Sequence, residues 1–396
     1  MFPRARRLTT TLGALVATGV FVMSAFAGGA SAAGTRNTHT WNTGASSSIT
    51  SITLTKNDAD MKRVAEYWNP ARLKQAQDNN PATPEVKPSN GGTASSAPVS
   101  PTPTGTAADA TAASGEATPA KATSYSMTRR TSSVVKPTLP TKKSPSVSTL
   151  PKTVGKVFFK IGNKEYWCSA SAVASRYHNL VATAGHCAYD AKQGLNADYW
   201  IFIPGYNQGR TPYGIYVGHS LNLHESFTGR GDYDYDYAFV TVHDGFVWKP
   251  GKTPNTYQME SVGSLEDNVG GQGLMVNRGV GLSVFAFGYP AAPHIDGSRP
   301  YDGQKMLWCD GRTYRTRAPT RLVETGVSLG CTFTGGASGG PWLIEYDPQR
   351  GVGYLNGVNS FAWDTDTDKR YDRISSPYFT QSTYVVYEYA ERQQSK

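Results

Sequence analysis

The sequence has only four cysteines in 396 residues, and it contains neither a CxxC pair nor an HxxxH spacing. Spacings of these kinds are typical of zinc sites, so we expect no metal and no cofactor. The chain also lacks an apolar run of roughly twenty residues, the length that a membrane-spanning helix needs. The apolar run from Leu12 to Ala27 is shorter and is followed by Gly28 and Gly29, so no stable membrane anchor is expected.

The C-terminal part of the chain has no net charge. The whole chain carries a formal charge of +9, from 39 Lys and Arg against 30 Asp and Glu. Residues 1–150 contain 16 basic and 7 acidic residues, and residues 151–396 contain 23 of each. Nucleic-acid-binding domains present a basic patch or stripe to the phosphates. The excess positive charge lies outside the C-terminal part, and no nucleic-acid partner is expected.

Residues 1–32 have the features of a secretory signal peptide. Arg4, Arg6 and Arg7 precede the apolar run, and Ala30-Ser31-Ala32 fits a small-residue cleavage site. We therefore expect a secreted, extracellular protein. An oxidising exterior favours disulfides over free thiols. The four cysteines form two pairs that are close in sequence, which predicts the disulfides Cys168 with Cys187 and Cys309 with Cys331.

Residues 33–88 are expected to form a pro-segment with short helices. Met61, Val64, Ala65 and Trp68 follow the i, i+3, i+4, i+7 spacing that places apolar groups on one helix face. Asn69-Pro70 is typical of a helix start and predicts a second short helix through Leu73. The segment either docks on the following domain or is only transiently helical.

Residues 89–150 are rich in Ser, Thr, Pro, Ala and Gly and contain few large apolar residues. Such a composition buries too little surface to offset the entropy of ordering, which predicts a disordered linker. Dibasic pairs at Arg129-Arg130 and Lys142-Lys143 are candidate sites of proteolytic cutting.

Residues 151–396 are predicted to form an all-β domain. Short apolar or alternating runs such as "KVFFKIG" and "YAFVTV" are separated by Gly, Pro, Asn and Asp, a pattern typical of a barrel or a sandwich. Helical character is found only near the end, in "YVVYEYAERQQ". A monomer is expected.

Three residues of this domain combine into a candidate catalytic site. His186 follows an apolar strand in "VATAGHC", beside a half-cystine that would fix its loop. Asp236 stands where a polar turn enters the run "YAFV". Asp234 lies two residues earlier, on the same face of an extended strand, and is the rival candidate. Ser338 lies within "TGGASGGP", whose glycines allow backbone amides to face a developing oxyanion. The amides of Gly336 and Ser338 are the expected donors.

The motif around Ser338 also fits the nucleophile elbow of α/β-hydrolases, which carry their histidine after the serine. No histidine follows Ser338, so an esterase is excluded. The order His186, Asp236, Ser338, together with "TAGHC" and "SGGP", resembles the chymotrypsin/trypsin-like serine peptidases. Within that family the chain is most similar to secreted bacterial glutamyl-endopeptidase-like members. The resemblance covers nearly all of residues 154–390.

The resemblance implies two packed six-stranded antiparallel β-barrels with a short C-terminal helix. It also implies a serine endopeptidase that acts on protein or peptide substrates through an acyl-enzyme intermediate. A secreted binding protein that keeps the fold without catalysis is the alternative. In the family pattern the specificity pocket and the substrate-pairing strand map to Thr332, Asn359, Ser360, Phe361 and Ala362.

Two departures from the family pattern concern activation and specificity. The digestive enzymes have an aspartate before the serine that holds a newly cut N-terminus, and this chain has Ala337 there. We therefore expect activation without that buried ion pair. Neither Thr332 nor Asn359 supplies the charge that would select Lys, Arg or Glu side chains.

The acidic run Asp364–Asp372 lacks the glycine and the final glutamate of a calcium loop, which favours a solvated turn.

Overall fold

The computed structural model describes residues 36–41, 47–76, 133–142, 150–254 and 256–395. The predicted signal peptide, part of the pro-segment and most of the predicted linker lie outside these residues. Among the described helices, none combines the length and the apolar character that crossing a bilayer requires.

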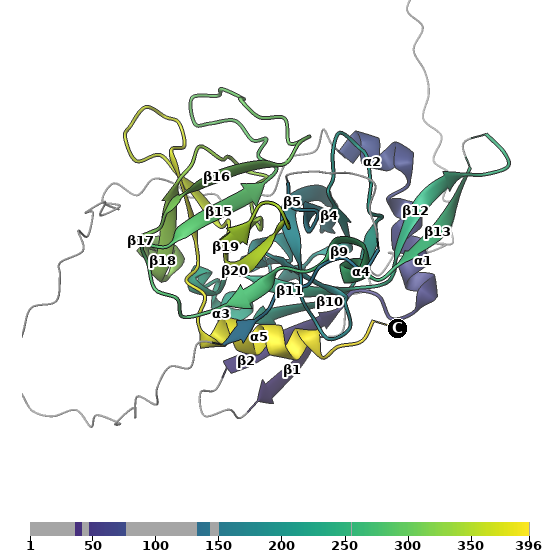
Figure 1. The fold of residues 1–396 in the computed structure, drawn as a ribbon, viewed down its shortest axis with the longest axis horizontal. Coiled ribbons are helices and arrows are strands. Elements are labelled where there is room, and N and C mark those ends of the chain that lie inside the picture. Colours follow the sequence, from purple (N-terminus) through teal and green to yellow (C-terminus); the bar gives the residue numbers. More distant parts are fainter. Residues whose placement is uncertain (1–35, 42–46, 77–132, 143–149, 255, 396) are drawn as a thin grey trace, which may run out of the picture. The chain divides into compact units, whose positions relative to one another are not determined.

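The first half of the domain is a closed barrel of six antiparallel strands (Figure 1). Its strands are β4 (Val154–Ile161), β5 (Lys164–Val173), β6 (Leu180–Thr183), β9 (Asp198–Pro204), β10 (Tyr216–His224) and β11 (Ala238–Val242). Pairing between β10 and β9 closes the sheet. In β4 the consecutive residues Val157, Phe158 and Phe159 are all buried, because one face fills the barrel and the other is covered by neighbouring segments.

The second half is built from two sheets around a separate apolar core. One sheet contains β14 (Gly273–Met275), β15 (Ser283–Gly288), β16 (Leu307–Arg312), β19 (Pro341–Asp347) and β20 (Val352–Val358). The other contains β17 (Tyr314–Ala318), β18 (Val323–Gly330), β21 (Phe361–Trp363) and β22 (Arg373–Ser376). The disulfide Cys309–Cys331 joins β16 to the residue after β18. The pair β14 and β20 is parallel, in an otherwise antiparallel arrangement.

Short elements connect these strands. They are a 3₁₀ turn at Gly185–Cys187, the hairpin β7 (Tyr189–Asp190) and β8 (Leu195–Asn196), α3 (Glu225–Arg230), a 3₁₀ turn at Tyr233–Tyr235, the hairpin β12 (Gly245–Pro250) and β13 (Tyr257–Gly263), α4 (Leu265–Val269) and a 3₁₀ turn at Pro319–Arg321. The predicted C-terminal helix is α5 (Gln381–Glu391), which begins at a capping box on Thr380. Figure 1 shows α5 lying along β10 and β11.

The N-terminal described residues form β1 (Arg36–Trp41), β2 (Ser47–Thr53), α1 (Asp58–Tyr67) and α2 (Pro70–Ala76). Strand β1 pairs with β2, and β2 pairs antiparallel with β10 of the barrel. Along α1 the apolar stripe expected from the sequence faces inward, with Val64, Ala65 and Trp68 buried and Met61 half-buried. In the described part of this segment, Trp68 and Leu73 are buried in the same core as residues of the barrel.

Residues 133–142, predicted to be part of a disordered linker, instead pair with the folded domain. Strand β3 (Val134–Val135) lies antiparallel to β14. Thr138 and Gly271 exchange two backbone hydrogen bonds of 2.9 and 3.1 Å. Composition did not indicate this order because it comes from backbone pairing with a distant segment, which needs no large apolar side chain. The prediction is therefore wrong for these ten residues.

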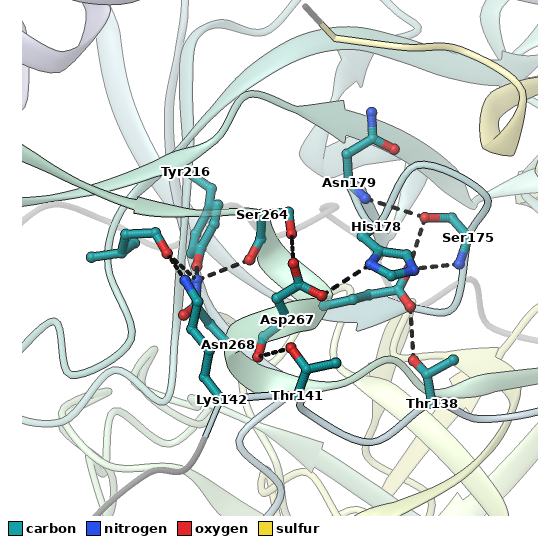
Figure 2. A network of polar contacts seen from close by, with 12 residues as sticks. Thr138, Thr141, Lys142, Ser175, His178, Asn179, Tyr216, Ser264, Asp267 and Asn268 are labelled. Atoms are coloured by element: carbon teal, nitrogen blue, oxygen red, sulfur yellow. Dashed lines mark hydrogen bonds and ion pairs between the residues drawn. The ribbon is translucent and has the colours of Figure 1, made fainter.

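Figure 2 shows the polar contacts of this segment with α4. The Thr138 hydroxyl donates to the buried carboxylate of Glu266 at 2.7 Å, and Ser175 donates to the same carboxylate through its amide and its hydroxyl. The Lys142 amide donates to the carbonyl of Asp267 at 3.0 Å. Burial raises the pKa of Glu266, although the hydrogen bonds from Thr138 and Ser175 oppose the shift.

The turn between β2 and α1 covers two histidines, from which we predict a fall in stability at acid pH. Thr55 contacts His243 at 2.7 Å, and the rings of His243 and His219 lie 5.3 Å apart. Burial, and then the neighbouring His243, lower the pKa of His219 to about 4. An unfolded histidine titrates near pH ~6.5. The unfolded chain therefore binds more protons between these two values, and stability should fall as the pH falls from about 6.5 to about 4.

Thermal unfolding measured across this pH range checks the prediction. The melting temperature should fall less steeply in a His219→Gln variant, which cannot take up the proton. Equal slopes in the two proteins would show that other groups cause the acid sensitivity.

Candidate active site

Neighbouring strands bring His186 and Asp236 together. His186 lies in the 3₁₀ turn that follows β6, and Asp236 directly precedes β11. These two strands pair with Ala238 opposite Thr183, so the segments at their ends meet. The disulfide Cys168–Cys187 ties the histidine turn to β5. The cysteine pairs are those that the sequence predicts.

The Asp236 carboxylate holds the His186 side chain at Nδ1. Its Oδ2 and Oδ1 lie 2.9 and 3.2 Å from that nitrogen, and Oδ1 also accepts from the His186 amide at 2.8 Å. Asp236 is fully buried. Gly185 allows this approach, because a Cβ there would lie 2.9 Å from the Phe227 ring and 3.1 Å from Asp236 Oδ1. Within the described residues the other ring nitrogen, His186 Nε2, is buried and has no hydrogen-bond partner.

The rival carboxylate, Asp234, faces elsewhere. It accepts from the amides of Glu324 and Thr325 at the start of β18. Asp236 receives a further hydrogen bond at 2.6 Å from the Ser360 hydroxyl. The sequence did not indicate this contact, since Ser360 lies 124 residues away along the chain.

Ser338 lies on a glycine-rich turn that packs against the first barrel. Its carbonyl accepts from the Ser169 amide at 2.8 Å. A Cβ on Gly339 would lie 2.1 Å from Thr183 Oγ1 and 2.8 Å from the Ala184 amide nitrogen, so only glycine fits beside the segment that leads into His186. Packing therefore places the serine turn and the histidine turn against each other.

Carbonyl groups on this turn fix the direction of its amides. The Gly335 carbonyl accepts from the amides of Ala291 and Ala292. The Ala337 carbonyl accepts from the Gly340 amide and from the Asn359 side chain. In a planar trans peptide the N–H points opposite to the C=O. The amides of residues 336 and 338 thus point away from these internal contacts, as donors to an oxyanion must.

Ala337 is buried in the apolar core of the second half. It packs against Gly288, where a Cβ would come within 2.9 Å of the Ala337 methyl group. Gly288 therefore has no room for a side chain of its own beside Ala337. Ala337, which stands where the digestive enzymes have an aspartate, is therefore closely packed in an apolar environment.

Asn359 is an internal structural residue rather than a residue of an open pocket. Its Nδ2 donates to the carbonyls of Phe287 and Ala337 at 2.9 Å, and its Oδ1 accepts from Trp342 Nε1 at 2.7 Å. These bonds support the serine turn from beneath. Position alone suggested a substrate contact, but the side chain is turned inward.

The other predicted substrate-binding residues differ in exposure. Thr332 is exposed and its hydroxyl lies 2.5 Å from the Tyr301 hydroxyl. Phe361 and Ala362 belong to β21, which pairs with β22 and forms the edge of its four-stranded sheet. Among the described strands no other one pairs with β21, so its outer edge can accept an extended peptide.

Lys156 lies behind the serine turn and was not indicated by the sequence. Its ammonium lies 3.5 Å from the centre of the Trp167 ring and donates to the Gly303 carbonyl at 3.1 Å. Trp167 in turn contacts Gly336, where a Cβ would lie 2.5 Å from the indole. Burial lowers the pKa of Lys156 well below its usual value. A lysine in a strand is usually solvated, so no local signal could have shown this one.

Two clusters in the described part of the chain have metal-ligand atoms within reach of each other. The first, around His186, contains Cys168 and Cys187, whose sulfurs are joined in a disulfide. The second is Asp364, Asp366 and Asp368, where Asp364 and Asp366 accept amide hydrogen bonds that close their own turn. These contacts are those of an acidic turn.

The chain is similar to known proteases. No protein-family model matches it. The protease Anisep from Arthrobacter nicotinovorans is 30% identical, with a TM-score of 0.50 over 62% of this chain and 98% of that chain. The thermostable serine protease AL20 from an extremophilic microorganism is 29% identical, with a TM-score of 0.49. The match covers 61% of this chain and 98% of that chain.

A curated relative matches over a shorter stretch. It is the extracellular metalloprotease of Bacillus subtilis strain 168, which is 27% identical over 168 residues. The match covers 42% of this chain and 44% of the relative, so the chain spans less than half the length of that protein.

Proposed function

The chain belongs to the chymotrypsin-like family of serine peptidases, and from this premise we propose that it is a secreted endopeptidase with Ser338, His186 and Asp236 as its catalytic triad. The observation that supports this triad is the orientation of the His186 ring. Its Nδ1 is held by a buried carboxylate, and its Nε2 has no partner among the described residues. An imidazole oriented in this way can accept a proton at Nε2.

In the proposed mechanism Ser338 Oγ attacks the peptide carbonyl while His186 Nε2 takes the hydroxyl proton. Asp236 keeps the proton of the imidazole on Nδ1 and stabilises the imidazolium that forms. The amides of Gly336 and Ser338 donate to the oxyanion. His186 then returns the proton to the leaving amine, which leaves an acyl-enzyme on Ser338. Water hydrolyses the acyl-enzyme by the same proton transfers in reverse.

The substrate is proposed to bind as an extended strand along β21. The outer edge of Phe361–Trp363 supports this, because backbone hydrogen bonds to a sheet edge position a peptide whatever its sequence. Thr332 at the expected pocket base carries no charge, and it supports no selection of basic or acidic side chains.

Secretion, cutting of the chain between the pro-segment and the peptidase domain, and a monomeric state complete the proposal. Support for an extracellular location comes from the two disulfides and the residues of the predicted signal peptide. The relative from Bacillus subtilis is also described as extracellular.

Labelling with a fluorophosphonate probe tests this function. The probe forms a covalent bond with a serine only where a base and an oxyanion hole activate it. We expect one label per chain, on Ser338, and none on the Ser338→Ala variant. Peptide mass spectrometry identifies the labelled residue. A correctly folded protein that takes up no label would favour the alternative, a binding protein that has kept the fold.

A further inference from the structure

Residues 47–76 are built into the first barrel as an extra strand and two helices. Strand β9 pairs with β10 only as far as Val217. Strand β2 then pairs with residues 220–224 of β10, opposite the edge that β11 occupies. Ile49 and Ile52 of β2 are fully buried in the main apolar core, which also contains the residues of the barrel interior. This segment therefore adds a strand to the barrel sheet and apolar side chains to the main core.

Trp68 anchors the helical part of the segment. It is fully buried, with its ring 5.8 Å from that of Phe158 in β4. Its indole nitrogen donates to the Tyr199 carbonyl of β9 at 2.5 Å, and its own carbonyl accepts from Trp248 of β12 at 3.3 Å. A tryptophan enclosed on three sides and satisfied at its nitrogen is a typical anchor of a stable interface.

Polar contacts fix the register of the segment. Thr55 is fully buried, and its hydroxyl donates to the Gly218 carbonyl at 2.9 Å. Arg72 of α2 forms an ion pair of 2.5 Å with Glu165 of β5, which Tyr67 also contacts. The turn after β2 and helix α2 are thus both held by residues of the barrel.

The segment also contacts the loop that carries Asp236. Strand β10 ends at His224 and continues into α3, and the Thr50 hydroxyl of β2 lies 2.8 Å from that of Thr228 in α3. The residue before Thr228 in α3, Phe227, packs against Gly185 beside His186. Residue 50 is therefore linked to the histidine turn through α3, by the hydrogen bond to Thr228 and by the contact of the Phe227 ring with Gly185.

We propose that residues 47–76 stay bound to the peptidase domain after the chain is cut in the linker, as a strand-donating partner that holds the loop of residues 224–236. The proposal rests on the function proposed above, since it concerns the geometry of the same site. The partner is a fragment of this chain. It supports the site from the far side of β10.

Retention is tested in the full chain carrying Ser338→Ala, so that the result does not depend on catalysis. A recognition sequence for an unrelated site-specific protease is inserted between residues 89 and 128, and the purified chain is cut and passed through gel filtration. We expect the fragment that contains residues 47–76 to elute with the domain in equal amounts by mass spectrometry. Trp68→Ala should release it, whereas the matched control Lys62→Ala, on the exposed face of α1, should not. Release of the unsubstituted fragment would overturn the proposal.

Support of the loop is tested with Thr50→Val, which keeps the shape of the side chain but removes the contact with Thr228. In the Ser338→Ala chain, amide hydrogen exchange of residues 224–236 should rise at least several-fold, and the Lys62→Ala control should leave it unchanged. In the chain with Ser338, kcat should fall roughly tenfold while KM stays the same. Unchanged exchange in Thr50→Val would refute the supporting role, whether or not Ser338 proves to be the nucleophile.

Discussion

Replacing Ser338 with alanine is expected to lower kcat for a peptide substrate by roughly 10⁶-fold, and replacing Asp236 with asparagine by roughly 10⁴-fold. In the proposed mechanism the serine supplies the attacking oxygen, so its removal would leave only substrate binding and the oxyanion donors. Asparagine can occupy the buried site of Asp236, but it cannot keep the His186 proton on Nδ1 or stabilise the imidazolium.

Steady-state kinetics on the purified variants measures these effects, with Ser360→Ala as a matched control. That change removes one hydrogen bond to the same Asp236 carboxylate and leaves the charge in place. A hydrogen bond to a charged group contributes about 1.5–3 kcal/mol, so a loss of roughly ten- to a hundred-fold is expected. The double variant Ser338→Ala with His186→Ala should be no slower than Ser338→Ala alone, because the residues act as a unit. Additive losses would contradict a shared mechanism.

Replacing Ala337 with aspartate is expected to destabilise the folded state by about 3–5 kcal/mol, the cost of a buried charge without a partner. Ala337 is buried among apolar side chains and packs tightly on Gly288. Thr153, which directly precedes β4, accepts hydrogen bonds from the Ala172 amide at 2.8 Å and from the Gln272 side chain at 2.6 Å, so this residue is held away from the serine turn.

Chemical unfolding of the Ala337→Asp protein, compared with Ala337→Ser, measures this cost. Serine adds a small polar group without a charge and should cost much less. The prediction also bears on activation, since it requires forms that begin between Ser144 and Val154 to have similar turnover. A stable Ala337→Asp protein, or activity that depends on one particular terminal amine, would show that the terminus inserts beneath the serine turn.

Local patterns were sufficient to predict much of this protein. Period-two runs indicated the β domain, the spacing from Met61 to Trp68 indicated a helix with a buried face, and the neighbours of His186 and Ser338 marked both residues as candidates. These signals are short-range, because side-chain period and turn chemistry depend only on nearby residues. The order of His186, Asp236 and Ser338 also excluded the α/β-hydrolase arrangement before any contact was known.

Contacts between distant segments were decided by the tertiary structure alone. Strand pairing placed Asp236, and not Asp234, beside His186. It also turned the Asn359 side chain inward and brought Ser360 to the Asp236 carboxylate. It also ordered residues 133–142, whose composition predicts disorder, because backbone hydrogen bonds with a partner strand depend on register and not on side-chain type. Lys156 is buried against Trp167 for a similar reason: its surroundings come from residues that are near only after the barrel has closed.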